Sequence, residues 1–355
     1  MPLFTSHRHL SDRLVWASDS RWAATVAALQ WFCFAVALCL VCTIAEAEPQ
    51  VSRLPPVDDI FFVDSRSEAE DVSPWRTEEY SPDGEEFYPA PSSDFCAGKD
   101  EPWTLQVMPM GLMYRSYLAG AKEPRFASTW TSDSQLGDVW DAALGGRLGL
   151  LRYGTRDPVF PEGWQVDLEG GSQARLDPHD NSNALLSVDF RVGIPVTYAR
   201  GRWQFKTGYY HISSHLGDEF LLMNPTARRI NYTRDAVMLA VGYYWTERLR
   251  LYGETAYALS ATEGAEPLEF QFGADWAPAR DTGVLGAPFV ATNVHLREDV
   301  DFGGNFVLQA GWAWRQFPRG SLFRIGVQYY KGKSDQYEYF DTSEERFGWG
   351  IWADF

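Results

Sequence analysis

Apolar and polar residues alternate in steps of two along most of the chain from about residue 125 to the C-terminus. The alternation is clearest in 164–174, 186–198, 235–245, 268–276 and 306–315. A period of two places successive side chains on opposite faces of a β-strand, and no helical period competes with it here. The pattern therefore predicts an all-β fold.

Turn residues divide this region into twelve expected strands. They are roughly 125–131, 140–152, 163–174, 185–198, 202–215, 232–246, 249–260, 268–277, 287–297, 304–316, 321–332 and 345–355. An even number of strands is what a closed antiparallel bacterial barrel needs. The short links at 199–201, 246–248 and 318–320 fit periplasmic turns, and the long links after the fifth and eleventh strands fit extracellular loops. Pro195, which lacks a backbone donor, and the irregular first strand are the weakest points, and 103–122 could hold another extended element.

The two faces of these strands differ in a way that indicates a membrane. One face carries Gly, Arg, Asp and Glu, and the other ends in Trp, Tyr and Phe. Transmembrane barrels combine a polar lumen, a lipid-facing apolar band and aromatic girdles. Such a wall is apolar at only half of its positions, which explains how 15 Trp, 17 Tyr and 22 Phe coexist with a mean hydropathy of −0.30. We expect a transmembrane antiparallel β-barrel at 103–355.

The first 47 residues have the features of a secretory signal peptide. Arg8, Arg13 and Arg21 precede an apolar run at 23–44, and Ala45-Glu46-Ala47 provides a small-x-small cleavage signal. We expect cleavage before Glu48; an uncleaved membrane anchor is the alternative. Export combined with the barrel pattern implies the outer membrane as the final location. Three of the four cysteines lie in this leader, so the mature chain keeps only Cys96.

Residues 48–102 are expected to form an acidic disordered tether. Of the net charge of −17, this segment supplies the larger part, with 15 acids and 4 bases in 48–101. It is also rich in Pro and Ser, which disfavours a packed core. A partner-binding arm is the alternative. The net negative charge argues against a nucleic acid as partner.

The last strand carries a further signal. Phe347, Trp349, Ile351, Ala353 and Phe355 share the outward parity. A terminal Phe on an alternating amphipathic strand resembles the signature that outer-membrane assembly machinery recognises, so this machinery and membrane lipids are the expected partners.

Strand 202–215 contains the one arrangement that indicates chemistry. His211, Ser213 and His215 continue its lipid-facing parity, where hydrocarbon offers polar groups no partners. A His and a Ser two residues apart lie side by side, so that the imidazole can activate the hydroxyl as a nucleophile. Asn231 or Asp235 on the neighbouring strand could orient the imidazole.

Other interpretations of this region stay open. Asp218 and Glu219 are alternative orienting groups. The histidines could also be rim residues without a catalytic role. His211, His215, Asp218 and Glu219 could instead bind a divalent cation such as calcium, although their spacing is not diagnostic. No other cofactor or metal is expected.

The H-x-S arrangement of His211 and Ser213 resembles that of outer-membrane phospholipase A and of the lipid A deacylase, which implies a lipid esterase of the serine type. The run from His211 to Phe220, with 191–195, 109–118 and 123–126, resembles the bacterial family called domain of unknown function 1207. That resemblance covers roughly 103–355 and implies no activity.

The lumen is the second candidate site. The predicted inward side chains include Asp167, Glu169, Asp189, Arg191, Glu254 and Arg315. Their mixed signs favour a salt-bridged plug over a selective pore, which more often shows a ring of one sign. We therefore expect either a surface-facing lipid hydrolase or a non-catalytic barrel, the latter a narrow channel or a structural scaffold.

Overall fold

The computed structural model describes residues 101–355 except 134–136, 181, 228, 263 and 317–319. The predicted leader and nearly all of the predicted tether lie outside the described residues. In the described part, no helix is long and apolar enough to cross a membrane.

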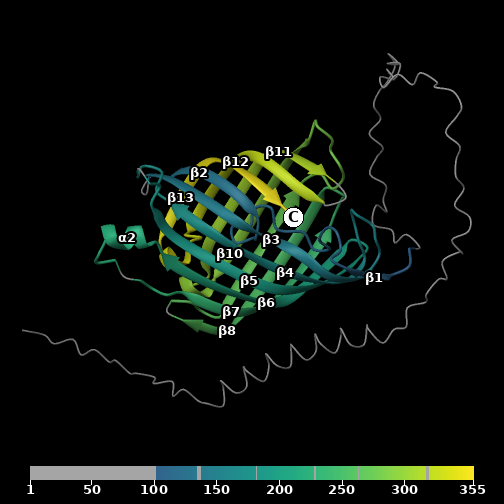
Figure 1. The fold of residues 1–355 in the computed structure, drawn as a ribbon, viewed down its shortest axis with the longest axis horizontal. Coiled ribbons are helices and arrows are strands. Elements are labelled where there is room, and N and C mark those ends of the chain that lie inside the picture. Colours follow the sequence, from purple (N-terminus) through teal and green to yellow (C-terminus); the bar gives the residue numbers. More distant parts are fainter. Residues whose placement is uncertain (1–100, 134–136, 181, 228, 263, 317–319) are drawn as a thin grey trace, which may run out of the picture. The chain divides into compact units, whose positions relative to one another are not determined.

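Twelve strands, β2 to β13, form a closed antiparallel barrel (Figure 1). Their bounds are β2 Phe126–Asp133, β3 Gly137–Gly154, β4 Gly163–Leu176, β5 Leu185–Arg200, β6 Trp203–Leu216, β7 Thr233–Tyr244, β8 Leu249–Thr262, β9 Leu268–Trp276, β10 Ala287–Arg297, β11 Gly303–Gln316, β12 Ser321–Lys333 and β13 Ser343–Asp354. Each strand pairs with its sequence neighbours, and β13 pairs with β2 to close the ring. The predicted twelve-strand barrel is confirmed.

Within the described residues, three short helices and one extra strand complete the fold. The helices are α2 Asp218–Met223, η2 Glu298–Val300 and η3 Tyr337–Tyr339. The strand β1, Thr104–Val107, pairs only with the end of β3. We call the end of the barrel with β1 and Phe355 the terminal end, and the opposite end with α2 and η3 the loop end (Figure 1).

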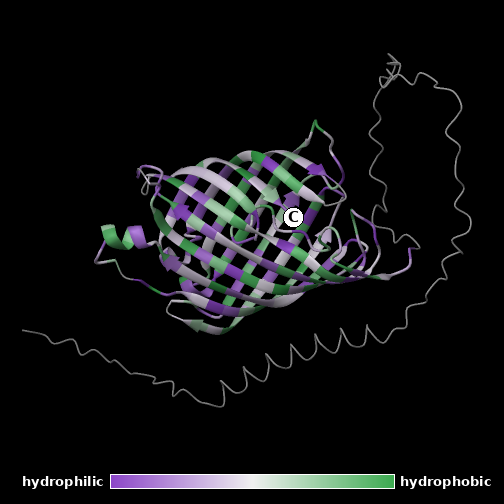
Figure 2. Cartoon of the chain, viewed as in Figure 1, coloured by the Kyte–Doolittle hydropathy of each residue, from purple (hydrophilic) through white to green (hydrophobic). Residues whose placement is uncertain are grey.

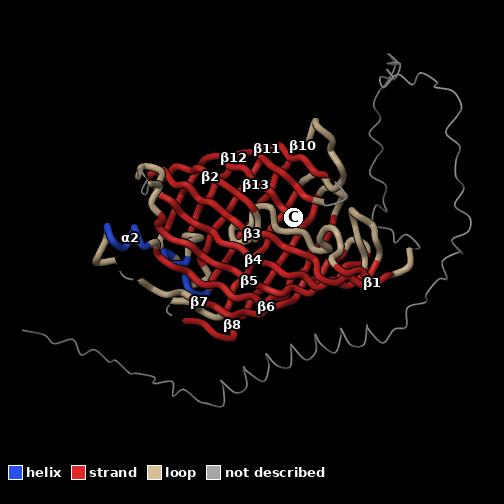
Figure 3. The backbone as a smooth tube through the Cα atoms, viewed as in Figure 1, coloured by secondary structure: helices blue, strands red, loops and turns tan. Residues whose placement is uncertain are grey.

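The wall has the predicted two faces. Along β6, Trp203 and Phe205 are about half exposed, whereas Gln204 and Lys206 are buried. Tilted strands make up the wall in Figure 3, where the near and far sides of the barrel overlap, and green and purple residues alternate along the strands in Figure 2. Pro195 lies within β5 and pairs with Gly208 of β6, but the ladder to β4 is interrupted beside it, because proline has no N–H to donate.

The core of the protein is the lumen, and a length of chain fills part of it. Residues 109–125, which we call the inserted segment, connect β1 to β2 through the inside of the barrel. Tyr114 and Tyr117 are fully buried, and Tyr117 stacks on Tyr252 of the wall at 3.9 Å between ring centroids. Gly145 and Gly171, paired across β3 and β4, leave room on the inner wall beside Pro124.

The inserted segment is held by side chains from the wall rather than by a backbone ladder. Guanidinium groups donate hydrogen bonds to five of its carbonyls: Arg152 to Gly111, Arg147 to Tyr114, Arg250 to Arg115 and Ser116, and Arg324 to Leu118, at 2.6–3.1 Å. Gln204 donates to the carbonyl of Met113 at 2.6 Å. Buried carbonyls need such donors, and a guanidinium can serve two at once.

The wall arginines are themselves neutralised by acids. Arg147 pairs with Asp167 at 2.7 Å, Arg191 with Glu169 at 2.9 Å, and Lys206 with Glu254 at 2.7 Å. The carboxylate of Asp189 accepts a hydrogen bond from the ammonium group of Lys122, in the inserted segment. Five of the six predicted lumen residues thus lie in ion pairs inside the barrel. Arg315 also points inward, but it donates to the carbonyl of Pro278 at 2.7 Å.

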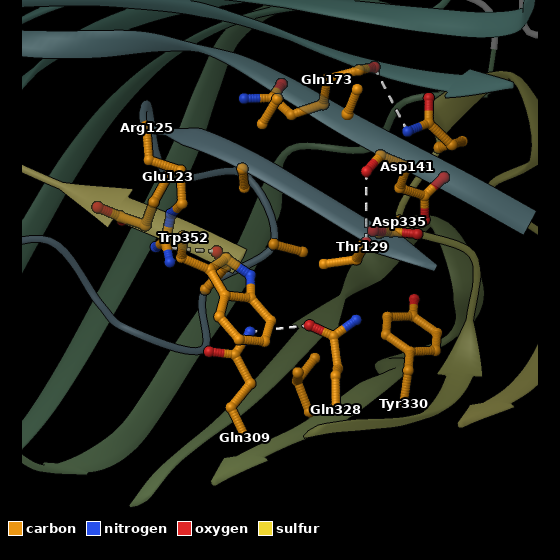
Figure 4. Close-up of a pocket in the computed structure, with 17 residues that line it drawn as sticks. Glu123, Arg125, Thr129, Asp141, Gln173, Gln309, Gln328, Tyr330, Asp335 and Trp352 are labelled. Carbon is orange, nitrogen blue, oxygen red and sulfur yellow. Dashed lines mark hydrogen bonds between the residues drawn. The ribbon is translucent and has the colours of Figure 1, made fainter. Parts of the chain in front are cut away.

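The loop between β12 and β13 closes the lumen from the loop end. Tyr337 of η3 is buried and stacks on Tyr232 at 4.5 Å, and its N–H donates to Asp189 at 3.2 Å. Lys122 lies 5.1 Å from the centre of the Tyr337 ring, so the inserted segment and this loop meet. Three cavities between the described lumen residues measure about 60, 30 and 20 Å³, each with room for a few waters at most; Figure 4 shows the one of about 60 Å³.

Removing the charge of Arg250 should destabilise the barrel strongly. Arg250→Met leaves the carboxylate of Asp275, now 2.6 Å from the guanidinium, buried and unpaired, and it orphans two carbonyls of the inserted segment. Breaking a buried pair from one side costs about 3–5 kcal/mol. The free energy of unfolding in detergent micelles, from urea titration, measures the loss.

Lys331→Met is the matched control, because Lys331 pairs with Glu345 at 3.0 Å with both side chains more than half exposed. Its loss should stay below about 1 kcal/mol. Equal effects of the two substitutions would contradict the role assigned to Arg250.

A second prediction concerns Asp335 in the loop between β12 and β13. Its carboxylate accepts from Arg346 at 2.7 Å and from Arg175 at 3.0 Å. Burial raises the pKa of Asp335, but Arg346 and Arg175 lower it by more, so the net shift is downward. A carboxyl with a lowered pKa in the folded state stabilises the protein above its unfolded pKa, and this stability is lost as the pH falls through the folded value.

We therefore expect Asp335→Asn to lower the free energy of unfolding by about 1.5–3 kcal/mol at neutral pH, the range for hydrogen bonds to charged groups. The gap between the native and variant proteins should narrow as the pH falls below about 4, the usual pKa of Asp. Urea titrations at pH 7, 5 and 3 test this, with exposed Asp341→Asn as control. A gap that does not depend on pH would contradict the charge-based explanation.

Candidate functional site

The end of β6 presents its polar residues to the outside of the barrel, as predicted. His211, Ser213 and His215 are partly exposed, whereas Ile212 and Ser214 are buried toward the lumen. The strand continues through Leu216 before α2 begins. The two histidines and Ser213 therefore lie on the wall of the barrel and not in a loop.

His211 forms a hydrogen bond with Asp235 of β7. The two residues are direct partners in the ladder, and Nδ1 of His211 lies 2.9 Å from Oδ1 of Asp235. Their side chains are 37% and 31% exposed. When the carboxylate is ionised it can only accept, so Nδ1 carries the proton and Nε2 is left to act as an acceptor.

Tyr209 also binds Asp235, which the sequence analysis did not predict. Its hydroxyl donates to the same Oδ1 that contacts His211. Tyr209 precedes His211 by two residues, and side chains two apart on a strand share one face. Both side chains therefore lie on the outer face of β6, beside β7. With two donors the carboxylate is satisfied in a wall that is otherwise apolar, where an unpaired one would be costly.

Ser213 lies next to this pair without a hydrogen bond to it. In the ladder it faces Phe190 of β5 and Thr233 of β7. Residues two apart on a strand are separated by about 7 Å along the chain. Among the described residues no hydrogen bond joins the Ser213 hydroxyl to His211. The His–Asp contact is formed, whereas the Ser–His contact is not. Catalytic hydrogen bonds are often long or poorly aligned in structures without substrate.

The remaining predicted site residues have other partners. Asn231 lies in the loop before β7, where its N–H donates to Glu338 at 3.3 Å, so Asp235 rather than Asn231 contacts His211. Nδ1 of His215 accepts from Arg229 at 3.0 Å. Asp218 and Glu219 begin α2, and Glu219 accepts the N–H of Leu185 at 3.2 Å.

These positions do not gather into a cation site. No group of three or more His, Cys, Asp or Glu side chains in the described part of the chain could hold a metal ion. The Arg229 guanidinium beside His215 also disfavours a cation there. The four residues predicted as a calcium site are thus dispersed among separate contacts.

A row of hydroxyl groups crosses the outer wall at Ser213. Successive ladder pairs connect Ser172 of β4, Phe190, Ser213, Thr233 and Thr262 of β8. The hydroxyls of Thr233 and Thr262 share a hydrogen bond, and Thr262 also donates to the carbonyl of Asn231 at 3.1 Å. We call Ser172, Ser213, Thr233 and Thr262 the hydroxyl row. Parity indicates that each faces outward, but only the register of the sheet brings them together.

Comparison with solved structures finds other barrels at low identity. Outer membrane phospholipase A from Escherichia coli matches at 11% identity with a TM-score of 0.42, over 65% of this chain and 92% of that one. The Salmonella typhi outer membrane phospholipase, a dimer with bound calcium, gives 11% and 0.42, over 65% and 90%. A Rhodopseudomonas blastica porin mutant gives 12% and 0.28, over 66% and 99%.

Among curated proteins there is no match. A family model covers residues 46–355 and therefore most of the sequence, including every strand of the barrel. The chain is a twelve-strand antiparallel β-barrel, and it belongs to the family described as protein of unknown function, DUF1207.

Proposed function

We propose that this barrel is a surface-facing hydrolase of lipid acyl esters in the outer membrane. The observation that carries the proposal is the hydrogen bond between His211 and Asp235 on the outer wall, two residues before Ser213. A base held by a carboxylate beside a hydroxyl is the arrangement that activates a serine nucleophile. The assignments are Ser213 as nucleophile, His211 as general base and Asp235 as orienting group.

The chemistry follows from the free ring nitrogen. Nε2 of His211 takes the proton of Ser213 as its oxygen attacks the ester carbonyl carbon. Collapse of the tetrahedral intermediate breaks the ester C–O bond, and the imidazolium returns the proton to the leaving alcohol. Water then hydrolyses the acyl-serine through the same base, which releases a fatty acid. Asp235 stabilises the imidazolium, and Tyr209 holds the carboxylate in position.

The position of the three residues favours a lipid as substrate. They face the side of the wall that carries exposed Phe190, Val192 and Ile194, which is the face expected to meet hydrocarbon. They also lie near the end of β6 that leads into 217–232, the longest connection between successive strands of the barrel ring, so the ester region of the outer leaflet is within reach. A soluble substrate would have to enter this layer from water.

The alternative is a non-catalytic structural barrel. The observation in its favour is the filled lumen, because the inserted segment and the loop at η3 meet inside it. The same filling disfavours the channel interpretation. In a structural barrel, His211 and Asp235 would be a rim contact, and the hydroxyl row would bind lipid headgroups without turnover.

Hydrolysis by purified protein separates the two proposals. Barrel in mixed micelles with phospholipid, or with lipid A, should release fatty acid, and Ser213→Ala should reduce the rate at least 1,000-fold, on the order of a triad knockout. Asp235→Asn should reduce it by about the same order, because the imidazole loses its orienting acceptor.

Ser260→Ala is the matched control, since Ser260 lies opposite Asp235 on the exposed part of β8 and has no assigned role. It should retain the native rate. Equal rates for Ser213→Ala and the native barrel, or no release from either lipid, would overturn the proposal and favour the structural barrel.

A further inference from the structure

A groove opens on the outer wall beside His211. It spans β3 to β6, has a volume of about 360 Å³, and is lined by Leu144, Gly171, Ser172, Phe190, Arg191, Val192 and His211. Leu144, Phe190 and Val192 are each about half exposed or more, so their side chains form the sides of the groove. The volume lies at the lower end of the range for small-molecule sites, which is about 300–1,000 Å³.

The groove is formed by missing side chains rather than by a distorted sheet. Gly170 of β4 pairs with Val192 of β5, which lines the groove. The neighbouring Gly146 of β3 is covered by the ring of Phe355, 3.1 Å from an added Cβ, so the opening lies on the β4 side. A Cβ atom at Gly170 would meet only the carbonyl of Arg191, at 3.7 Å. The outer face of β4 is therefore open at Gly170, next to Val192 of the groove, and a larger side chain at Gly170 would occupy that space.

The distribution of polar groups gives the groove a direction. Its walls are hydrocarbon, whereas the Ser172 hydroxyl and the imidazole of His211 are the polar side chains that reach it from the outer face. Ser172 belongs to the hydroxyl row that contains Ser213. An occupant needs an apolar body and a polar group that sits near these side chains.

We propose that this groove, which we name the acyl groove, binds one acyl chain of a membrane lipid with its ester group placed at Ser213 and His211. The identification of the chain as that of the substrate rests on the proposed hydrolase; the binding itself does not. Lipid tails surround the whole wall, so their burial alone confers no preference. The preference arises because a groove contacts a chain on several sides and packs it more closely than a flat wall does.

A second groove on the same wall provides an internal comparison. It is larger, about 660 Å³, and is lined by apolar residues of β4 to β9, among them Val196, Leu239 and Phe270, but not by a histidine. Gly253 lies in this second groove with no atom within 4 Å of an added Cβ. Gly170, which borders the acyl groove through its ladder partner Val192, and Gly253, which lines the second groove, are thus a matched pair.

Photocrosslinking tests the binding. The full barrel carrying Ser213→Ala, so that no turnover occurs, is placed in vesicles of phosphatidylethanolamine and phosphatidylglycerol with a trace of phospholipid bearing a diazirine on the acyl chain. Crosslinks should be several-fold enriched on the peptides of the acyl groove relative to Phe323–Val327 of the open β12 wall.

The Gly170→Leu variant should lose this enrichment of crosslinks, and the Gly253→Leu variant should retain it. Uniform labelling of the wall, or an enrichment that survives Gly170→Leu, would overturn the acyl groove.

A second measurement, on barrels that keep Ser213, separates this proposal from the hydrolase. The ratio of kcat/KM for a long-chain ester to that for a short-chain ester should fall at least tenfold in Gly170→Leu and stay at the native value in Gly253→Leu. Enriched crosslinking without any hydrolysis would support the acyl groove and overturn the hydrolase. Hydrolysis whose chain-length ratio is unaffected by Gly170→Leu would overturn the acyl groove as the substrate site.

Discussion

The hydrogen bonds from wall arginines to the carbonyls of the inserted segment are the interaction on which the rest of this structure depends. A ring of twelve strands encloses more space than its inward side chains can fill, unlike an eight-strand barrel. The chain itself fills the difference, but residues 109–125 form no strand and have no ladder partner for their carbonyls. Arg147, Arg152, Arg250 and Arg324 provide the donors. Their charges in turn require the acids of the lumen.

Because the lumen is filled, a functional site is expected on the outer face of the barrel wall. The ion pairs of Asp167, Glu169, Arg191 and Glu254 hold the core of the protein together. Polar side chains on the outer face have no such structural task, and hydrocarbon makes them costly there. The contact of His211 with Asp235, the hydroxyl row and the acyl groove all occur on neighbouring strands of that face. Their proximity is the basis for proposing lipid chemistry.

The alternation of apolar and polar residues predicted the strands of the wall, because each strand is long enough for the alternation to repeat several times. The expected strand 287–297 matches β10 at both ends, and most other ends fall within three residues. The inserted segment was missed because it has no period, and its tyrosines resemble those of the girdles. Only the possible extended element at 103–122 hinted at β1.

The sequence predicted contacts in the candidate site only where two residues meet two conditions. They must share a face of the sheet, and they must lie on strands joined by a hairpin. Asp235 satisfied both conditions with respect to His211, and the structure places the two in contact. Asn231 satisfied the parity, but it falls before the first residue of β7, where its backbone binds Glu338. The hydroxyl row and the acyl groove span four or more strands, and they depend on the register of each hairpin and on where glycines face each other. A single sequence does not specify these relations.

Conductance in planar bilayers tests the central claim, that the inserted segment and the loop at η3 close the lumen of the folded barrel. Purified full-length protein, shown to be inserted and folded, should give no current steps under an applied voltage, because the inserted segment and the loop at η3 meet inside the lumen. Stable open steps of the native barrel would contradict the account. They would mean that the arginine-held segment leaves the lumen in a membrane.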